Sequence, residues 1–248
     1  MANVLLSAKG IEIRFGGVVA ADGIDLDVYE GENLAIIGPN GAGKTTFLNV
    51  STGYLRPQAG SVSFLGRDIT AQLPRTVTRL GIARAFQIPQ LFLDQTVMEN
   101  MLIAAVSLNG RPSGVKALSS LPQMPEMERL LDLVGVGEFA GRKARELPEG
   151  QRKLVDIALA LALKPRLLLM DEPTSGVASS EKFGIMDILT RALAREKVTS
   201  VFVEHDMDVV FDVADEIFVL HFGEVLETGA PEAIKKSRRV QEIYLGTD

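Results

Sequence analysis

Apolar residues follow two different spacings along the chain, one typical of strands and the other typical of helices. Near the N-terminus, short apolar segments alternate with polar residues, as in IDLDV, and this pattern predicts strands. Residues 34–37 are apolar at every position, which is typical of a strand buried on both faces. The elements predicted in this region are strands at residues 4–8, 11–15, 24–28, 34–37 and 61–64, and a helix over residues 44–52.

The spacing becomes helical in the middle of the chain, and strands and helices alternate again toward the C-terminus. Residues 96–106, 126–134 and 150–163 have helical spacing, whereas 109–125 is rich in Gly, Ser and Pro and predicts a loop. The elements predicted after that are strands at 167–171 and 199–204, helices at 181–195 and 207–214, a hairpin through Gly223, and short helices near 232–236 and 240–244.

These elements predict an α/β protein in which a mostly helical segment is inserted into a sheet-containing core. We expect one domain over residues 3–248, with a core of residues 3–87 and 163–248 and a helical lobe of about residues 88–162. No internal repeat is apparent.

Composition and charge exclude several classes of protein. The net charge of −6 argues against a nucleic-acid partner, because phosphate contacts need an excess of Lys and Arg. The chain has no cysteine, which excludes disulfides and thiolate metal sites. Neither a secretory signal nor a run of roughly 20 apolar residues is present, so we expect a soluble protein that meets a membrane only through a partner.

The segment GPNGAGKTT matches the phosphate-binding pattern G-x-x-x-x-G-K-[ST] between a predicted strand and a predicted helix. Its glycines allow backbone N–H groups to wrap a phosphate, and the helix N-terminus adds a positive dipole end. We expect Lys44 to reach the β- and γ-phosphates of ATP and the Thr45 hydroxyl to coordinate Mg²⁺. The predicted phosphate-binding residues are Gly38, Pro39, Asn40, Gly41, Ala42, Gly43, Lys44, Thr45 and Thr46.

The segment RLLLMDE is an apolar strand that ends in two carboxylates. At the C-terminal end of a parallel strand, Asp171 is placed to hold Mg²⁺ opposite Thr45. Glu172, one residue further, is placed to polarise the attacking water as a general base. Beside a phosphate-binding loop, this pair predicts nucleotide hydrolysis.

Four further segments resemble the ATP-binding-cassette (ABC) family. Gln87 lies 43 residues after Lys44, like the glutamine of that family's Q-loop. LPEGQRK precedes a helix and the acidic strand, like the family's signature sequence; PTSGVA follows Glu172, like its D-loop; and His205 lies 34 residues after Asp171, like its switch histidine. The resemblance covers nearly the whole chain and implies a P-loop NTPase (RecA-like) core with an N-terminal antiparallel β subdomain and an inserted α-helical subdomain.

The resemblance also implies roles for individual side chains. Gln87 would bond Mg²⁺ or the attacking water while its loop contacts a partner. His205 would donate a hydrogen bond to the γ-phosphate. Gly150 and Gln151 of the signature would contact the nucleotide held by the opposite subunit of a dimer. Phe15, 29 residues before Lys44, either stacks on adenine as in family members or belongs to the core.

Within the family, the sequence is similar to the ATPases of branched-chain amino-acid importers. The similarity rests on IRFGG, RAFQIPQLF, EHDMDVVFDVADEIFVL and VQEIYLG. It implies membrane permease subunits, a second ATPase subunit (an identical or a different chain), and, indirectly, an extracytoplasmic solute-binding protein as partners. It also implies a peripheral location on the cytoplasmic face of the inner membrane.

The signature departs from the common family pattern. Pro148 stands where serine is usual and Glu149 where the first glycine is usual, and Ala178 replaces the Asp or Asn that commonly ends the D-loop. Proline removes a hydroxyl and an N–H donor, and a carboxylate repels a triphosphate unless it points away. Either the variant is fully active, or the ATP site that this signature completes is weak.

Three other functions are weighed against the importer. They are a soluble ABC factor that remodels a macromolecule, an ABC exporter of the lipopolysaccharide type, and a P-loop small-molecule kinase. The signature-like segment and His205 argue against the kinase, and the single cassette without a long insertion argues against the remodelling factor. A short basic run, from Lys235 to Arg239, is interpreted as a solvated helix face.

Overall fold

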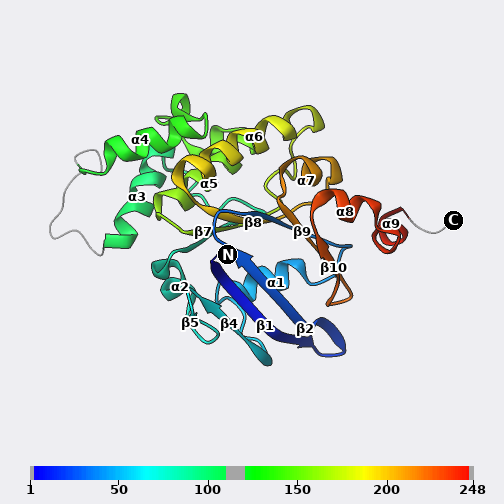
Figure 1. The fold of residues 1–248 in the computed structure, drawn as a ribbon. Helices are drawn as coiled ribbons and strands as arrows, with labels where there is room; N and C mark the ends of the chain where they lie inside the picture. Colours follow the sequence, from blue (N-terminus) through cyan, green and yellow to red (C-terminus); the bar gives the residue numbers. More distant parts are fainter. Residues whose placement is uncertain (1–2, 110–120, 246–248) are drawn as a thin grey trace.

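The structure is a computed structural model that describes residues 3–109 and 121–245. Two sheets lie side by side, with most helices on the far side of the larger one (Figure 1). The smaller sheet is antiparallel in the order β2-β1-β4-β5. Its strands are β1 (Val4–Phe15), β2 (Val18–Tyr29), β4 (Ala59–Phe64) and β5 (Arg67–Asp68).

The larger sheet has the order β10-β9-β3-β8-β7-β6, and its strands are parallel except for β10 at the edge. Parallel strands need crossover connections, which is why helices separate them along the chain. These strands are β3 (Asn33–Ile37), β6 (Ile82–Ala85), β7 (Leu167–Asp171), β8 (Thr199–Val203), β9 (Glu216–His221) and β10 (Glu224–Gly229).

The helices cover the larger sheet and connect its strands. They are α1 (Lys44–Ser51), α2 (Pro74–Leu80), α3 (Val97–Asn109), α4 (Met124–Leu133), α5 (Glu149–Ala162), α6 (Ser179–Glu196), α7 (Met207–Val213), α8 (Pro231–Lys236) and α9 (Arg238–Leu245). In Figure 1, α1 lies between the two sheets, whereas α3, α4, α5 and α6 lie together on the other side. Within the described part of the chain, no helix is long and apolar enough to cross a membrane.

The core has two layers because side chains alternate across the larger sheet. On β3, Leu34 and Ile36 pack into the cluster that lies between the sheets and α1, whereas Ala35 and Ile37 pack into the cluster under the helices. The same alternation recurs on β7, where Leu167 and Leu169 face one cluster and the intervening residues face the other. Burial on both faces explains why these strands read as continuous apolar runs.

The α/β class is confirmed, and several elements differ from the sequence expectation. β1 and β2 are single long strands with irregular register, whereas the sequence pattern predicts shorter separate ones. α2 and β6 were not predicted, and α4 begins at Met124, inside the predicted loop. Residues 110–120 of that loop lie outside the described residues.

Candidate nucleotide-binding site

The loop of residues 38–43 joins the C-terminal end of β3 to the N-terminus of α1, and its glycines make that connection possible. Gly43 has φ 103°, and a Cβ at this position would lie 2.2 Å from the carbonyl oxygen of Ala20. A Cβ at Gly38 would lie equally close, 2.2 Å, to the carbonyl oxygen of Leu220. Only glycine fits both positions, so the tight turn of backbone N–H groups at the helix start depends on these residues.

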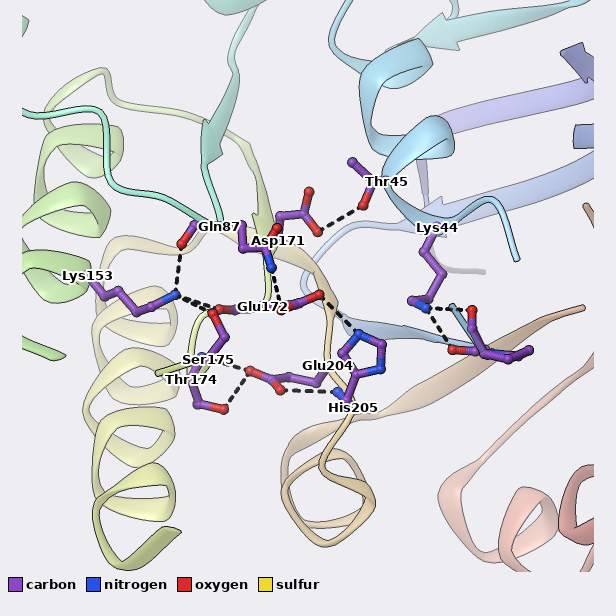
Figure 2. A network of polar contacts seen from close by, with 12 residues as sticks. Lys44, Thr45, Gln87, Lys153, Asp171, Glu172, Thr174, Ser175, Glu204 and His205 are labelled. Atoms are coloured by element: carbon purple, nitrogen blue, oxygen red, sulfur yellow. Dashed lines mark hydrogen bonds and ion pairs between the residues drawn. The ribbon is translucent and has the colours of Figure 1, made fainter. Parts of the chain in front are cut away.

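Lys44 is buried at the start of α1, and its ammonium lies over the loop. Its Nζ donates to the carbonyl oxygens of Gly38, at 2.7 Å, and Pro39, at 3.0 Å (Figure 2). Burial lowers the pKa of Lys44, and the neighbouring carboxylates of Glu172 and Asp171 oppose that shift. The loop therefore presents a fixed cation together with the positive end of α1, which suits a phosphate group.

A cavity of about 280 Å³ opens beside this loop. Its lining residues are Phe15, Val18, Ala20, Asn40, Gly41, Ala42, Gly43, Lys44, Thr45, Thr46, Glu172 and His205. Phe15 is 53% exposed and belongs to neither core cluster, so of the two sequence interpretations the structure favours an aromatic side chain available at the cavity. The cavity is thus lined by apolar side chains, by the phosphate-binding loop and by the candidate catalytic side chains of Glu172 and His205.

Asp171 and Thr45 approach each other across the site, as the sequence predicts. The Thr45 hydroxyl lies 3.4 Å from Oδ1 of Asp171. A hydroxyl and a carboxylate oxygen are the hard ligands that Mg²⁺ prefers, so the two side chains fit a magnesium ion shared with nucleotide phosphates. The other carboxylate oxygen, Oδ2, forms a buried ion pair of 2.8 Å with Arg84, which also donates to Asn49.

Glu172 brings the three candidate catalytic side chains together (Figure 2). Its Oε2 accepts a hydrogen bond of 2.8 Å from Nε2 of Gln87, and its Oε1 lies 3.0 Å from Nε2 of His205. Glu172 has φ 51°, a left-handed conformation that costs a non-glycine residue about 1–3 kcal/mol. Such strain persists only where neighbouring groups hold the backbone in place.

Glu204, a residue that the sequence analysis did not single out, supports this arrangement from below. Its buried carboxylate accepts hydrogen bonds from the backbone N–H and the hydroxyl of Thr174, at 2.8 and 2.7 Å. It also accepts one from the backbone N–H of His205 at 3.2 Å. Its position at the end of an apolar strand was the signal available in the sequence, because a buried carboxylate needs hydrogen-bond donors from neighbouring segments.

The signature segment lies apart from the cavity of its own chain. Pro148 is the residue before α5, and neither Gly150 nor Gln151 lines the cavity. The Glu149 carboxylate lies over Gly176, so close that a Cβ at Gly176 would be 2.4 Å from Oε1. The acidic side chain is therefore directed toward the D-loop of its own chain.

Comparison with known proteins decides the family. A family model described as ABC transporter matches residues 21–175. The chain belongs to the ABC transporter family. Its nucleotide site is that of an ATPase whose activity is coupled to transport, which excludes a small-molecule kinase.

Relatives and solved structures support the assignment over the full length. The chain is 34% identical to the high-affinity branched-chain amino acid transport ATP-binding protein BraF of Pseudomonas aeruginosa, and the match covers 99% of each chain. It is 33% identical to the corresponding protein LivG of Escherichia coli, again over 99% of each.

Among solved structures, the fold is similar to that of a nucleotide-free ATP-binding cassette from an ABC transporter, with a TM-score of 0.87 and 33% identity, covering 99% of this chain and 100% of the other. It is also similar to the ADP conformation of an ATP-binding cassette, with a TM-score of 0.86, 32% identity and the same coverage. These neighbours confirm the ABC ATPase fold, and they support nucleotide binding by this chain.

Proposed function

We propose that this ABC ATPase powers an importer of branched-chain amino acids or related small amides and acids. The observation that carries the proposal is the Glu172 carboxylate, held between Gln87 and His205 at the edge of the phosphate-binding cavity. The importer type is supported by the full-length relatives, whose names describe branched-chain amino acid transport.

In the proposed reaction, the P-loop residues and Lys44 hold the phosphates of ATP, and Phe15 stacks on the adenine ring. Thr45 and Asp171 would hold Mg²⁺, which supplies charge neutralisation at the β- and γ-phosphates. Glu172 accepts a proton from a water molecule whose oxygen attacks the γ-phosphorus, and ADP leaves. Gln87 orients that water, and His205 donates to the γ-phosphate oxygens.

The signature supports a dimer because neither Gly150 nor Gln151 lines the cavity of its own chain. In the proposed cycle, two cassettes pair head to tail, so that Gly150 and Gln151 of one complete the ATP site of the other. ATP favours this closed pair because it contacts both halves only there, and hydrolysis releases them. The second cassette is either an identical or a different chain.

The proposed route to the membrane runs through the segment after Gln87. Ile88 is 75% exposed and Phe92 is 59% exposed, and Phe92 lines a cavity of about 240 Å³ between this segment and α3 and α5. Exposed apolar side chains next to a catalytic glutamine suit a permease contact that senses the ATP site. The chain would then sit on the cytoplasmic face of the membrane, below a permease served by an extracytoplasmic solute-binding protein.

Co-purification tests the proposal. The tagged full chain, isolated from gently solubilised membranes of its own source, is expected to bring down permease subunits, and their solute-binding protein is expected to bind a branched-chain amino acid or a small amide. Isolation with an exporter permease would contradict the importer, and isolation without any membrane protein would contradict a transport role. Ile88→Ser together with Phe92→Ser should weaken capture of the permease while leaving ATP binding intact.

A further inference from the structure

A buried lysine lies behind the candidate catalytic residues. Lys153, on α5, is 3% exposed, so its ammonium depends on protein acceptors in place of water. Its Nζ donates to the backbone oxygens of Gln87, at 3.0 Å, and Glu172, at 2.8 Å, and to the hydroxyl of Ser175, at 2.9 Å (Figure 2). All three donors of the ammonium are used, as a buried cation requires.

The three acceptors belong to segments that are far apart in the sequence. Gln87 lies just after β6, whereas Glu172 and Ser175 belong to the turn after β7, which we call the catalytic turn (residues 172–175). Lys153 itself belongs to the first turns of α5, the helix that begins with the signature. One side chain therefore joins the signature helix, the Gln87 segment and the catalytic turn.

The bond to Glu172 acts on the strained residue of the site. Glu172 has its left-handed φ of 51°, and its backbone N–H donates to Val203 at 2.9 Å. Its carbonyl oxygen accepts from Lys153 and also from the N–H of Ser175 at 3.1 Å. Fixing both the N–H and the C=O of a residue fixes the direction of its Cα–Cβ bond, and the carboxylate at the end of this side chain contacts Gln87 and His205.

A second buried charge on α5 holds the other side of the Gln87 segment. Asp156, one turn after Lys153, accepts hydrogen bonds from the backbone N–H groups of Phe86, at 3.0 Å, and Gln90, at 3.1 Å. The helix therefore holds the segment 86–90 through a cation on its carbonyl and an anion on its N–H groups. A displacement of this segment must pull on α5, and through Lys153 on the catalytic turn.

We propose that Lys153 is a positioning residue for ATP hydrolysis that mechanically joins the Gln87 segment to the catalytic carboxylate. It holds Glu172 in its working direction, and it makes that direction depend on where the Gln87 segment and the signature helix stand. The proposal rests on the proposed role of Glu172 as the base. In this role the buried ammonium transmits movement of the exposed apolar residues beside Gln87 to the reacting site.

Substitution of Lys153 by methionine tests the proposal, because methionine keeps most of the length and apolar stem and removes the donors. The hydrogen bonds of the Lys153 ammonium go to Gln87, Glu172 and Ser175 and not to the loop 38–43, so the purified full chain with Lys153→Met should bind ATP within about twofold of the unaltered affinity and show at least a tenfold lower kcat. Lys182→Met is the matched control, because the ammonium of Lys182 pairs with Asp206 rather than with the catalytic turn or the Gln87 segment. An unchanged kcat in Lys153→Met, or an equal loss in both variants, would overturn the proposal.

Chemical rescue separates positioning from simple loss of a core residue. Because the chain has no cysteine, Lys153→Cys creates a single thiol that can be aminoethylated in the unfolded chain to regenerate an ammonium of nearly the same reach. After refolding, the aminoethylated protein should recover at least half of the kcat of the unaltered chain taken through the same cycle. A refolded, aminoethylated protein that binds ATP but stays as slow as its unmodified form would contradict the role of the ammonium.

Ser175→Ala provides a second variant that leaves the buried ammonium and its two other acceptors in place. It is expected to lower kcat two- to fivefold with unchanged ATP affinity, and if Lys153→Met does not fold, an unchanged kcat in Ser175→Ala overturns the proposal.

Amide hydrogen exchange makes the test independent of which residue is the base. In Lys153→Met, amide exchange should rise in both 86–90 and 172–175. A rise in neither segment would contradict the proposal that Lys153 connects them, even if Glu172→Gln shows that Glu172 is not the base.

Discussion

Gly43 shows how narrowly single residues determine the nucleotide site. Its position combines a left-handed backbone with a close approach to the carbonyl oxygen of Ala20, and Gly41 has the left-handed backbone alone. Both have positive φ, 103° and 83°, but nothing lies within 4 Å of a Cβ built at Gly41. The two positions therefore separate backbone strain from steric contact.

Gly43→Ala is expected to destabilise the nucleotide-free chain by more than about 2 kcal/mol, and Gly41→Ala by only about 1 kcal/mol. The larger cost arises because β2 must move away from the loop to admit the methyl group. Denaturant unfolding of both variants measures the two free energies. Equal costs would show that the contact with Ala20 does not constrain the loop.

Glu32, far from the site, should make stability depend on pH. Burial is the main cause that raises its pKa to about 7, and nearby Glu216 and Asp215 add to the shift. Between about pH 4.5 and 7 the folded chain keeps a proton that the unfolded chain has released, so the free energy of unfolding falls as the pH rises through that window.

Glu32→Gln removes this proton and can still accept the 2.7 Å hydrogen bond from the N–H of Tyr29. The variant should gain stability relative to the parent as the pH rises from 4.5 to 7, by on the order of 1 kcal/mol after allowance for solvent screening at this half-buried position. Unfolding curves at several pH values measure the difference. A difference that stays constant with pH would contradict the shifted pKa.

The candidate site could be predicted from the sequence where its residues follow a linear motif. Gln87, Glu172 and His205 were singled out by spacing, and the structure places Gln87 and His205 each within hydrogen-bond distance of the Glu172 carboxylate. Lys153 and Glu204 were missed, because their partners come from segments that only the fold brings near. A charged residue inside an apolar pattern indicates that its side chain has a hydrogen-bonding partner, but the pattern does not identify that partner.

At the scale of elements, the sequence predicts best those strands that are buried on both faces. β3, β7 and β8 were predicted almost residue for residue, because burial on both faces leaves polar residues only at the ends of these strands. α2 and β6 were missed because both are short, and α2 buries only Val77 of its seven residues, which is too little for a helical pattern. Its Pro74 at the start and Gly81 at the end were the available signals.

The signature helix offers a test of the unusual residues Pro148 and Glu149. Because the Glu149 carboxylate lies over Gly176 of its own chain, we expect it not to oppose the phosphates at the N-terminus of α5. The double variant Pro148→Ser, Glu149→Gly should therefore hydrolyse ATP within about twofold of the unaltered rate. Steady-state ATPase assays under conditions that allow pairing measure this, and a gain of tenfold would show that the natural signature is weak.

At the scale of the whole molecule, we propose that a second cassette completes each cavity, because Gly150 and Gln151 do not line the cavity of their own chain. We predict that ATP with Mg²⁺ draws Glu172→Gln cassettes into pairs, because binding persists without hydrolysis, and that ADP does not. Light scattering on the chain, alone and with the ATPase that co-purifies with its permease, measures the mass. Lys44→Ala is the control that should not pair, and the absence of pairing in either mixture would contradict the shared site.

The division of the chain into a core, residues 3–87 and 163–248, and a helical lobe of about residues 88–162 remains a prediction at this scale. α5 belongs to the lobe by sequence, yet Lys153 and Asp156 bind backbone groups next to β6 and β7. We therefore expect the lobe and the catalytic turn to move together rather than independently.

The most direct test of the central claim is the ATPase rate of Glu172→Gln measured beside its ATP affinity. Glutamine keeps the shape of the side chain and cannot accept the proton of the attacking water, so kcat should fall by about 10²- to 10⁴-fold while ATP binding stays within about twofold. Such a split would identify Glu172 as the base of this ABC ATPase. Near-normal turnover in Glu172→Gln would contradict the account.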